Sequence, residues 1–428
     1  MQIIKYPNIE EASKLLKRPV LEMENLQQKV IPIISSVKNG GDKALIELTS
    51  KFDKVELEQI RVQESEIEEA DKFVSDDLKN ATEVAKKNIF KFHSSQKTKI
   101  NKIEIDEGIT CWRKSVPIEK VGLYIPGGSS PLFSTLLMLG VPAKIAECKE
   151  ISVCTPPQHN GKIAPQILYV AKSLGITDVF KVGGAQAIAA MAYGTETITK
   201  VDKIFGPGNQ WVTAAKQLVN ADGIAIDMPA GPSEVLVIAD DSANPKFVAA
   251  DLLSQAEHGP DSQVVLITNS ENLVSAVTLE IDNFKIQLSR KEIIERSLQN
   301  SVMLLVKELD EVITISNNYA PEHLILAINN PEEIAEKVIS AGSVFLGNYS
   351  PESAGDYASG TNHTLPTNGF ASAYSGVSLD SFLKKITFQK LTKDGLSKLG
   401  KTIQIMAEEE GLDAHKLAVT IRTENANG

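Results

Sequence analysis

Residues 234–268, "EVLVIADDSANPKFVAADLLSQAEHGPDSQVVLIT", contain a strand, a helix and a second strand in succession. The runs "EVLVIA" and "QVVLIT" are apolar and rich in β-branched residues, as buried strands are. Between them, "NPKFVAADLLSQAEHG" predicts a helix that ends at Gly259-Pro260. A helix that joins two apolar strands is typical of a βαβ unit, so this stretch predicts parallel strands with helices on both faces of the sheet.

The same alternation runs from residue 121 to residue 347. Apolar strands such as "VGLYI" and "ISVCT" alternate with helical runs such as "APQILYVAKSLG". The pattern predicts an α/β fold with two incomplete, Rossmann-like parallel-sheet domains. The stretches "PGGSSP" and "PAGPSEV" each lead through a helix to a buried strand, which is compatible with a duplicated half-sheet. We expect smaller helical segments at both ends of the chain, the last two helices being "GLSKLGKTIQIMAEEEG" and "AHKLAVTIRTE".

Composition narrows the class of protein. The 428 residues are 42% hydrophobic and 23% charged, as in a globular protein with sizeable cores. The formal net charge of −11 argues against nucleic acid as a partner. The N-terminal stretch does not resemble a signal peptide and no apolar run reaches the length of a membrane span, so we expect a cytoplasmic protein. The three cysteines lack C-x-x-C spacing and indicate neither a disulfide framework nor a thiolate zinc site.

Polar side chains that could carry chemistry lie near the ends of the predicted elements. Gln255 and His258 are three residues apart and therefore share one face of the last turn of the quoted helix. Taken alone, the pair is better explained as a solvated amide and a helix-capping imidazole. His93, on the polar side of an N-terminal helix, is expected to be solvated. The other candidates are Glu322 and His323 before a strand, Asp356 and His363 in the long loop 347–381, and Glu410 and His415 near the C-terminus.

Eight motifs in series connect these candidates. They are "VGLYIPGG", "VGGAQAIAA", "KIFGPGN", "DMPAGPSEVLVIAD", "DLLSQAEHGPDSQ", "APEHL", "SAGDYASGTNHTLPT" and "EGLDAHK". Together they resemble the histidinol dehydrogenase family, in order, from about residue 110 to residue 422. The resemblance implies oxidation of L-histidinol to L-histidine, the last step of histidine biosynthesis, in two NAD-dependent steps through bound L-histidinal. It also implies one zinc ion per subunit.

The resemblance assigns a role to each candidate. His323 is the implied general base of both oxidations, and Glu322 is implied to activate the water that hydrates the aldehyde. Neighbours in a regular strand point to opposite sides, so both can face one substrate only where the backbone is irregular, and Pro321 makes that plausible. The implied zinc ligands are Gln255, His258, Asp356 and His415. The implied substrate-binding residues are these four ligands together with Ser233, His323, His363 and Glu410.

The nucleotide site is less distinct in the sequence. No G-x-G-x-x-G motif follows a strand and opens a helix, so the usual dinucleotide fingerprint is absent. "VGGAQAIAA" joins a strand to a helix through glycines, which could bring a phosphate near a helix N-terminus or could serve tight packing alone. The resemblance implies that NAD contacts Tyr124, Gln186 and Asn209.

The resemblance also implies an intertwined homodimer, in which Glu410 and His415 complete the active site of the neighbouring subunit. We expect four segments in each chain. They are residues 1–20, an N-terminal segment; 21–122 with 234–375, the α/β domain that carries the metal and catalytic residues; 123–233, the α/β domain that contacts NAD; and 376–428, a C-terminal helical segment that reaches the partner.

The residues alone leave three other functions open. A zinc hydrolase could use Glu322 to activate a metal-bound water, and the missing dinucleotide motif favours that alternative. A dehydrogenase could instead form a thiohemiacetal on Cys111 or Cys154, although neither has a visible base nearby. The third alternative is a metal-stabilised dimeric binding protein without catalysis.

Overall fold

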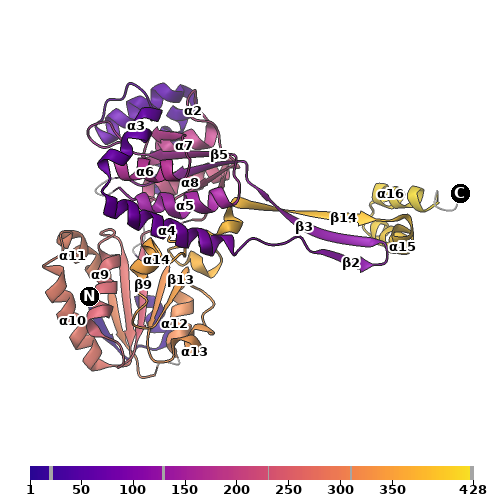
Figure 1. Ribbon diagram of the computed structural model, residues 1–428. Coiled ribbons are helices and arrows are strands. Elements are labelled where there is room, and N and C mark those ends of the chain that lie inside the picture. Colours follow the sequence, from indigo (N-terminus) through magenta and orange to yellow (C-terminus); the bar gives the residue numbers. More distant parts are fainter. Residues whose placement is uncertain (19–22, 128–130, 230, 309–310, 425–428) are drawn as a thin grey trace. The chain divides into compact units, whose positions relative to one another are not determined.

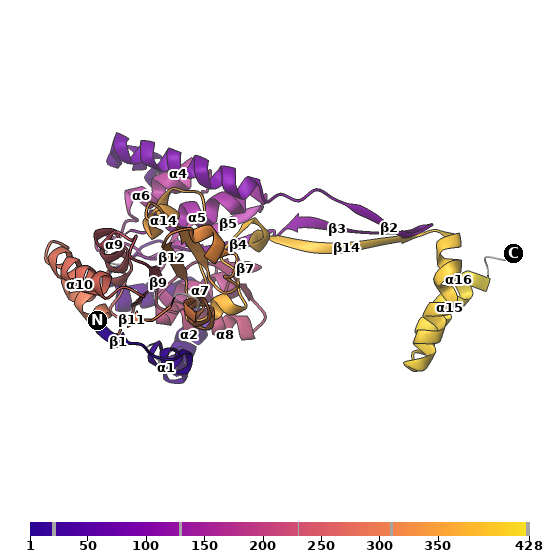
Figure 2. The same cartoon turned by 90° about the horizontal axis from the view of Figure 1, so that it is seen from below.

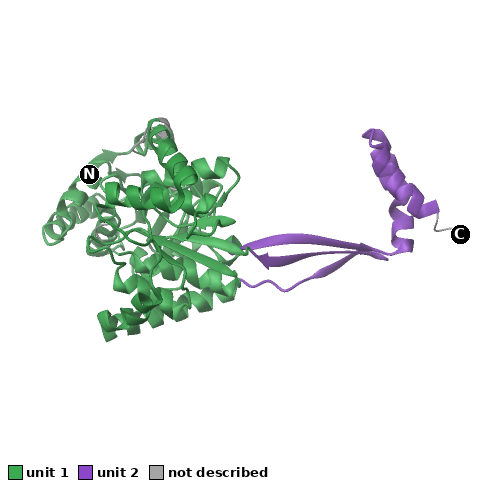
Figure 3. Cartoon of the chain, turned by 90° about the horizontal axis from the view of Figure 1, so that it is seen from above, with its two compact units in different colours: residues 1–95, 118–381 green, residues 96–117, 382–428 purple. Residues whose placement is uncertain are grey.

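The chain forms two compact units (Figure 3). The computed structural model describes residues 1–18, 23–127, 131–229, 231–308 and 311–424. Unit 1 comprises residues 1–95 and 118–381, and unit 2 comprises residues 96–117 and 382–428. Unit 1 contains two parallel sheets with helices packed against them, so the expected α/β class with two parallel-sheet domains is confirmed. Parts of the two stretches that suggested a duplication, 126–131 and 229–235, lie outside the described residues.

The first parallel sheet of unit 1 has five strands in the order β6-β5-β4-β7-β8. Its strands are β4 (Lys120–Tyr124), β5 (Glu150–Thr155), β6 (Val179–Lys181), β7 (Lys203–Phe205) and β8 (Ala225–Ile226). Its crossover helices are α5 (Phe133–Ile145), α6 (Pro165–Ser173), α7 (Gly184–Tyr193) and α8 (Gln210–Ala221). Every described residue of α7 from 185 to 192 is buried, because this helix is covered on its outer side as well.

The second parallel sheet has six strands in the order β1-β11-β10-β9-β12-β13. The strands are β1 (Gln2–Lys5), β9 (Glu234–Ala239), β10 (Gln263–Thr268), β11 (Val302–Leu305), β12 (His323–Ala327) and β13 (Ser343–Leu346). Its helices are α1 (Ile9–Leu15), α9 (Pro245–Ala256), α10 (Glu271–Lys285), α11 (Lys291–Gln299), α12 (Val312–Tyr319), α13 (Pro331–Ala335) and α14 (Glu352–Tyr357). The quoted stretch 234–268 forms β9, α9 and β10, as its pattern predicts.

Strand β9 shows why both faces of this sheet are apolar. Val235 and Val237 pack into one core with α9, α10 and α11, whereas Leu236 and Ile238 pack into another with α1 and α12. Figure 1 shows α9, α10 and α11 on one side of the strands and α12 on the other. Successive side chains of a strand point to opposite faces, so a strand covered on both faces must be continuously apolar.

The N-terminal helices pack around the five-stranded sheet. They are α2 (Met23–Asp53), α3 (Glu64–Glu69), the 3₁₀ turn η1 (Ala70–Phe73) and α4 (Asp76–Ser94). Helix α2 breaks at Gly41, where φ is 53°, and packs against α7 and α8. Helices α4 and α5 run side by side (Figure 2). The sequence predicts one domain from residues 21–122 together with residues 234–375. In the structure, α2 and α4 contact helices of the segment 123–233. The domain boundaries stay a prediction.

His93 corrects one expectation from the sequence. It is 1% exposed rather than solvated. Its Nδ1 lies 2.9 Å from the carbonyl oxygen of Ile89, and its Nε2 lies 3.5 Å from the amide nitrogen of Asn362. That amide donates in turn to the carbonyl of Met138 in α5. The loop that contains Asn362 covers this side of α4, which the helical period of the sequence could not show.

Unit 2 is built on an antiparallel sheet of three strands in the order β14-β3-β2. The strands are β2 (Lys102–Asp106), β3 (Ile109–Pro117) and β14 (Leu383–Leu391). Helices α15 (Lys393–Glu409) and α16 (Asp413–Glu424) follow and pack against each other, as the sequence predicts. Strand β14 was not predicted. It lies within residues 376–428, which were expected to form a helical segment. Among the described residues, every helix is too short or too polar to cross a lipid bilayer.

A buried ion pair supports the loop that follows β7. The Lys216 ammonium contacts the Asp227 carboxylate and donates to the carbonyl of Gly206 at 2.9 Å. The second carboxylate oxygen of Asp227 accepts from the Gly206 amide at 2.8 Å. Gly206 has a φ of 128°, and a Cβ there would lie 2.1 Å from the carbonyl oxygen of Tyr124. The pair therefore holds a backbone conformation that only glycine can adopt at this point.

Lys216→Met should destabilise the protein by about 3–5 kcal/mol, because it removes the ammonium that contacts the buried Asp227 carboxylate. The measurement is the free energy of unfolding in urea. Lys149→Met is the matched control, since Lys149 pairs with Glu119 at the surface, and its stability should hardly change. A Lys216→Met protein as stable as the control would show that the buried pair adds nothing.

Candidate active site

A cavity of about 1010 Å³ lies between the two parallel sheets of unit 1. Tyr124 at the carboxyl end of β4 and Asn209 after β7 line one side. Ser233 before β9 and His323 at the start of β12 line the other. The five-stranded sheet thus offers the carboxyl ends of its strands, where α/β sheets usually bind ligands, and the six-stranded sheet offers amino ends. Nine predicted site residues line the cavity: Tyr124, Asn209, Ser233, Gln255, His258, Glu322, His323, Asp356 and His363.

Helix α9 brings Gln255 and His258 to this cavity. Neighbouring residues of the helix, such as Leu252 and Ala256, pack into the core. Gln255 is fully buried in the last turn, whereas His258 is exposed just beyond the C-cap residue. The Gln255 amide donates to a carboxylate oxygen of Glu322 at 3.2 Å and lies 3.3 Å from His323 Nδ1. A solvated amide is therefore the wrong interpretation of Gln255.

Glu322 and His323 lie on the same side of the chain. Helix α12 ends at Tyr319, its C-cap residue Ala320 lies in the left-handed region with a φ of 50° and a ψ of 67°, and β12 begins at His323. The irregular backbone expected around Pro321 is present, and it brings Glu322 Oε2 to 3.6 Å from His323 Nδ1. The other ring nitrogen, Nε2, lies 3.4 Å from Asp356 Oδ1. One imidazole is thus held between two carboxylates.

The electrostatics of this group depend on burial and on the surrounding charges. Burial lowers the pKa of His323, but Glu322 and Asp356 raise it by more, and its pKa lies well above the ordinary value. Burial raises the pKa of Asp356, but the nearby His323 imidazole lowers it by more, so the net pKa falls below the ordinary value. A cation bound beside these carboxylates would offset their charge and favour the neutral imidazole that a general base requires.

Three side chains could hold such a cation. His258, Glu352 and Asp356 offer ligand atoms that all lie within 4.8 Å of one another. Burial raises the pKa of Glu352 to about 8, and its Oε1 accepts from Ser254 Oγ at 3.2 Å. Imidazole nitrogen and carboxylate oxygen are ordinary zinc ligands, so this donor set fits a zinc ion. Around the site, three buried polar atoms have no hydrogen-bond partner within the described parts of the chain: Gln255 Oε1, His323 Nε2 and Glu352 Oε2.

Glu352 was missed in the sequence. It lies in α14 four residues before Asp356, so the two carboxylates share one face of that helix. Because residues 347–381 were expected to form one long loop, the helical spacing was not recognised. A short helical run at this point, "ESAGDY", was the signal that could have identified Glu352.

His363 and the predicted NAD contacts lie around the same cavity. His363 Nδ1 is 2.9 Å from the carbonyl of Asp356, its Nε2 is 3.1 Å from Thr135 Oγ1, and burial lowers its pKa. The Tyr124 hydroxyl accepts from the Gly184 amide at 3.1 Å, at the start of α7. Asn209 caps α8 by accepting from the amides of the first turn. Gln186 is buried in the first turn of α7 and is absent from the described lining of the cavity.

Glu410 and His415 belong to unit 2, where Glu410 is the C-cap of α15 and His415 lies in the first turn of α16, both exposed.

The alternative of a catalytic thiol finds no support in Cys154. This residue is fully buried, and burial raises the pKa of its thiol far above the ordinary value. Cys111 lies in β3 of unit 2. A buried, protonated thiol is a poor nucleophile.

The fold and the site define an α/β enzyme in which an imidazole–carboxylate pair lies beside a candidate cation site. Residues 16–423 match the family model described as histidinol dehydrogenase. The chain is 60% identical over 424 residues to the histidinol dehydrogenase of Bacteroides fragilis (strain YCH46), and the match covers 99% of each chain. It is 53% identical over 432 residues to the histidinol dehydrogenase of Vibrio vulnificus (strain CMCP6), a match that covers 100% of this chain and 99% of the relative. The crystal structure of histidinol dehydrogenase from Elizabethkingia anophelis superposes with a TM-score of 0.98 at 58% identity, covering 100% of this chain and 99% of that one. The chain belongs to the histidinol dehydrogenase family.

Proposed function

We propose that this chain oxidises L-histidinol to L-histidine with two molecules of NAD, in the last step of histidine biosynthesis, and that the intermediate L-histidinal stays bound. Family membership supports an NAD-dependent oxidoreductase that acts on histidinol. The observation that carries the mechanism is the imidazole of His323, held between Glu322 and Asp356 with its Nε2 free of hydrogen-bond partners among the described residues. A cytoplasmic location is part of the same proposal.

His323 acts as the general base in both oxidations. In the first, it takes the proton of the substrate hydroxyl while a hydride leaves the carbon that bears this hydroxyl and passes to NAD, which yields the aldehyde. In the second, after that first proton has passed to solvent, it takes the hydroxyl proton of the aldehyde hydrate anion while a second hydride leaves for a second NAD, which yields the carboxylate. Between the two, Glu322 takes a proton from the water that adds to the aldehyde carbon. A base near neutral pKa suits both deprotonations.

We infer that one zinc ion per subunit is held by Gln255, His258 and Asp356 together with His415. Glu352 lies within ligand reach of His258 and Asp356 and extends this set. When bound, zinc supplies a Lewis acid that polarises and orients the substrate without changing its own oxidation state. The partnerless oxygen of Gln255 supports the assignment, because a buried amide oxygen without a donor is costly unless a cation faces it.

The same proposal assigns the binding residues. Substrate contacts come from the four zinc ligands together with His323, Ser233, His363 and Glu410, and the Glu410 carboxylate suits a cationic substrate. NAD contacts come from Tyr124, Gln186 and Asn209. Tyr124 and Asn209 both border the cavity on the side of the five-stranded sheet, which supports a nucleotide position there.

We further infer a homodimer in which Glu410 and His415 serve the active site of the partner subunit. Unit 2 supports this inference through its surface. Ile105 is 63% exposed, Met406 60% and Leu417 58%, and all three belong to this unit. Large apolar side chains exposed on one small unit favour a partner surface that covers them.

Each histidinol should yield two NADH without release of free histidinal, because a chelated aldehyde remains in the cavity between the steps. The measurement is NADH absorbance against limiting histidinol, in the presence of an aldehyde-trapping reagent. A single NADH per histidinol, or recovery of most of the aldehyde in the trap, would contradict the bound intermediate. Absence of NADH from the zinc-loaded protein would overturn the proposed function and favour a hydrolase or a binding protein.

A further inference from the structure

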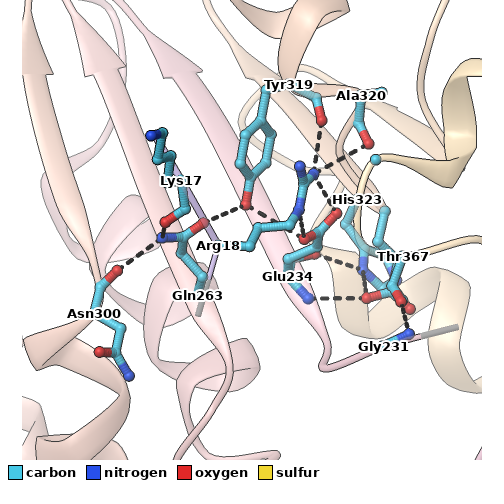
Figure 4. A network of polar contacts seen from close by, with 12 residues as sticks. Lys17, Arg18, Gly231, Glu234, Gln263, Asn300, Tyr319, Ala320, His323 and Thr367 are labelled. Carbon is cyan, nitrogen blue, oxygen red and sulfur yellow. Dashed lines mark hydrogen bonds and ion pairs between the residues drawn. The ribbon is translucent and has the colours of Figure 1, made fainter. Parts of the chain in front are cut away.

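Arg18 forms a buried fork with Glu234 beside the active site (Figure 4). Its Nε lies 2.5 Å from one carboxylate oxygen, and its Nη2 lies 2.8 Å from the other. The side chain of Arg18 is 18% exposed and that of Glu234 2%. Two parallel N–H···O bonds of this kind fix the orientation of both groups, which a lysine cannot reproduce.

The same guanidinium holds the turn that leads into β12. Nη2 donates to the carbonyl of Tyr319 at 2.6 Å and lies 3.4 Å from that of Ala320. The guanidinium carbon also stacks on the Tyr319 ring, 3.9 Å from its centre. Ala320 has a positive φ and precedes a proline, two circumstances that both disfavour its conformation. A strained turn persists only where its surroundings hold it, and Arg18 supplies contacts to two of its carbonyl groups.

Glu234 connects the fork to the two proposed catalytic side chains. Its main-chain amide donates to Glu322 Oε2 at 2.9 Å. Its carbonyl oxygen lies 3.3 Å from His323 Nδ1. One residue of β9 therefore contacts the carboxylate and the imidazole through its backbone, while its side chain is held by Arg18.

Arg18 is also the counter-charge that this region needs. Burial raises the pKa of Glu234, and the charge and hydrogen bonds of Arg18 oppose that shift. The Tyr319 hydroxyl donates to Gln263 at 2.9 Å and lies 3.4 Å from Glu234, so it connects the fork to β10. Gln263 donates in turn to the carbonyls of Lys17 and Asn300. The network thus joins the segment before residue 19 to three strands of the sheet.

We propose that Arg18 is a positioning residue for the oxidation proposed above. It fixes the turn at Tyr319–Pro321 and the strand start at Glu234, and through both it sets the relative geometry of Glu322 and His323. It lines the cavity but takes no part in proton transfer. The inference rests on the proposed function, because positioning matters to catalysis only if these two side chains carry the reaction.

The test uses the full-length, zinc-loaded protein with L-histidinol and NAD, and compares Arg18→Ala and Arg18→Lys with the wild type. Arg18→Ala should lower kcat roughly 10²-fold, as a small misplacement of reacting groups does, while KM for histidinol changes little. Arg18→Lys keeps the charge without the fork and should show an intermediate loss. Millimolar guanidinium ion should restore part of the kcat of Arg18→Ala, because the vacated space opens to the cavity.

Arg61→Ala is the matched control. Arg61 forms an ion pair with Asp178 in which the two side chains are 54% and 38% exposed, and its loss should leave kcat unchanged and unresponsive to guanidinium. Amide hydrogen exchange in residues 319–324 is the readout that does not depend on turnover, and it should speed up in both Arg18 variants. A wild type that produces no NADH would refute the proposed function, whereas the exchange would still test the positioning. The inference would be overturned if both Arg18→Lys and Arg18→Ala had a kcat within twofold of the wild type. It would also be overturned if amide hydrogen exchange in residues 319–324 were unchanged in a folded Arg18→Lys protein.

Discussion

His323→Asn should lower the rates of both oxidations by roughly 10²–10⁴-fold, the contribution expected of a general base. The imidazole is the group that accepts a proton in each step, and asparagine offers no basic nitrogen in its place. Its amide can still lie between Glu322 and Asp356, so the fold should persist. The measurement compares steady-state rates with histidinol and with supplied histidinal, after zinc content has been matched.

Glu322→Gln is the paired variant. It should spare the first oxidation more than the second, because only the hydration of the aldehyde needs a carboxylate to take a proton from water. Glutamine retains an oxygen that can accept from the Glu234 amide, so the hydrogen bond between this backbone amide and residue 322 is kept. The rate with histidinal should therefore fall more than the rate of the first hydride transfer. Equal losses in both variants and with both substrates would count against the division of roles.

A hybrid dimer should recover activity that neither parent has. His258→Ala and His415→Ala should each inactivate a homodimer, because each removes a proposed zinc ligand from both sites. If His415 serves the partner subunit, a dimer of one His258→Ala chain and one His415→Ala chain has both lesions at one site and none at the other. Such a hybrid should show roughly half the wild-type activity, as expected for two shared sites related by symmetry.

The hybrid is prepared from differently tagged chains, and its formation is verified before assay. His415→Ala homodimers should also bind less zinc than the wild type while keeping their fold, since His415 is an exposed residue of α16. If ligands act within one chain, each site of the hybrid carries one lesion and the hybrid stays as inactive as its parents. An inactive hybrid of verified composition would therefore exclude the shared site.

The amino-acid sequence by itself determined the class of fold and the local geometry of single elements. The stretch 234–268 forms the strand–helix–strand unit that its pattern predicts, because the period of apolar residues reflects which face of each element is buried. The spacing of Gln255 and His258 placed both near one end of α9, and Pro321 marked the irregular backbone before His323. These are properties of neighbouring residues, so a local pattern contains them.

The tertiary structure decided which distant residues meet. Arg18 and Glu234 are 216 positions apart, and nothing in either local sequence pairs them. His93 was expected in solvent, but it is buried beneath the loop that contains Asn362. Glu352 belongs to the candidate cation site because α14 places its carboxylate near His258. Strand β14 formed where a helical segment was expected, because β3 offered it nine paired positions. Such outcomes depend on packing and on hydrogen bonds between remote segments, whose free energy no local period of the sequence reports.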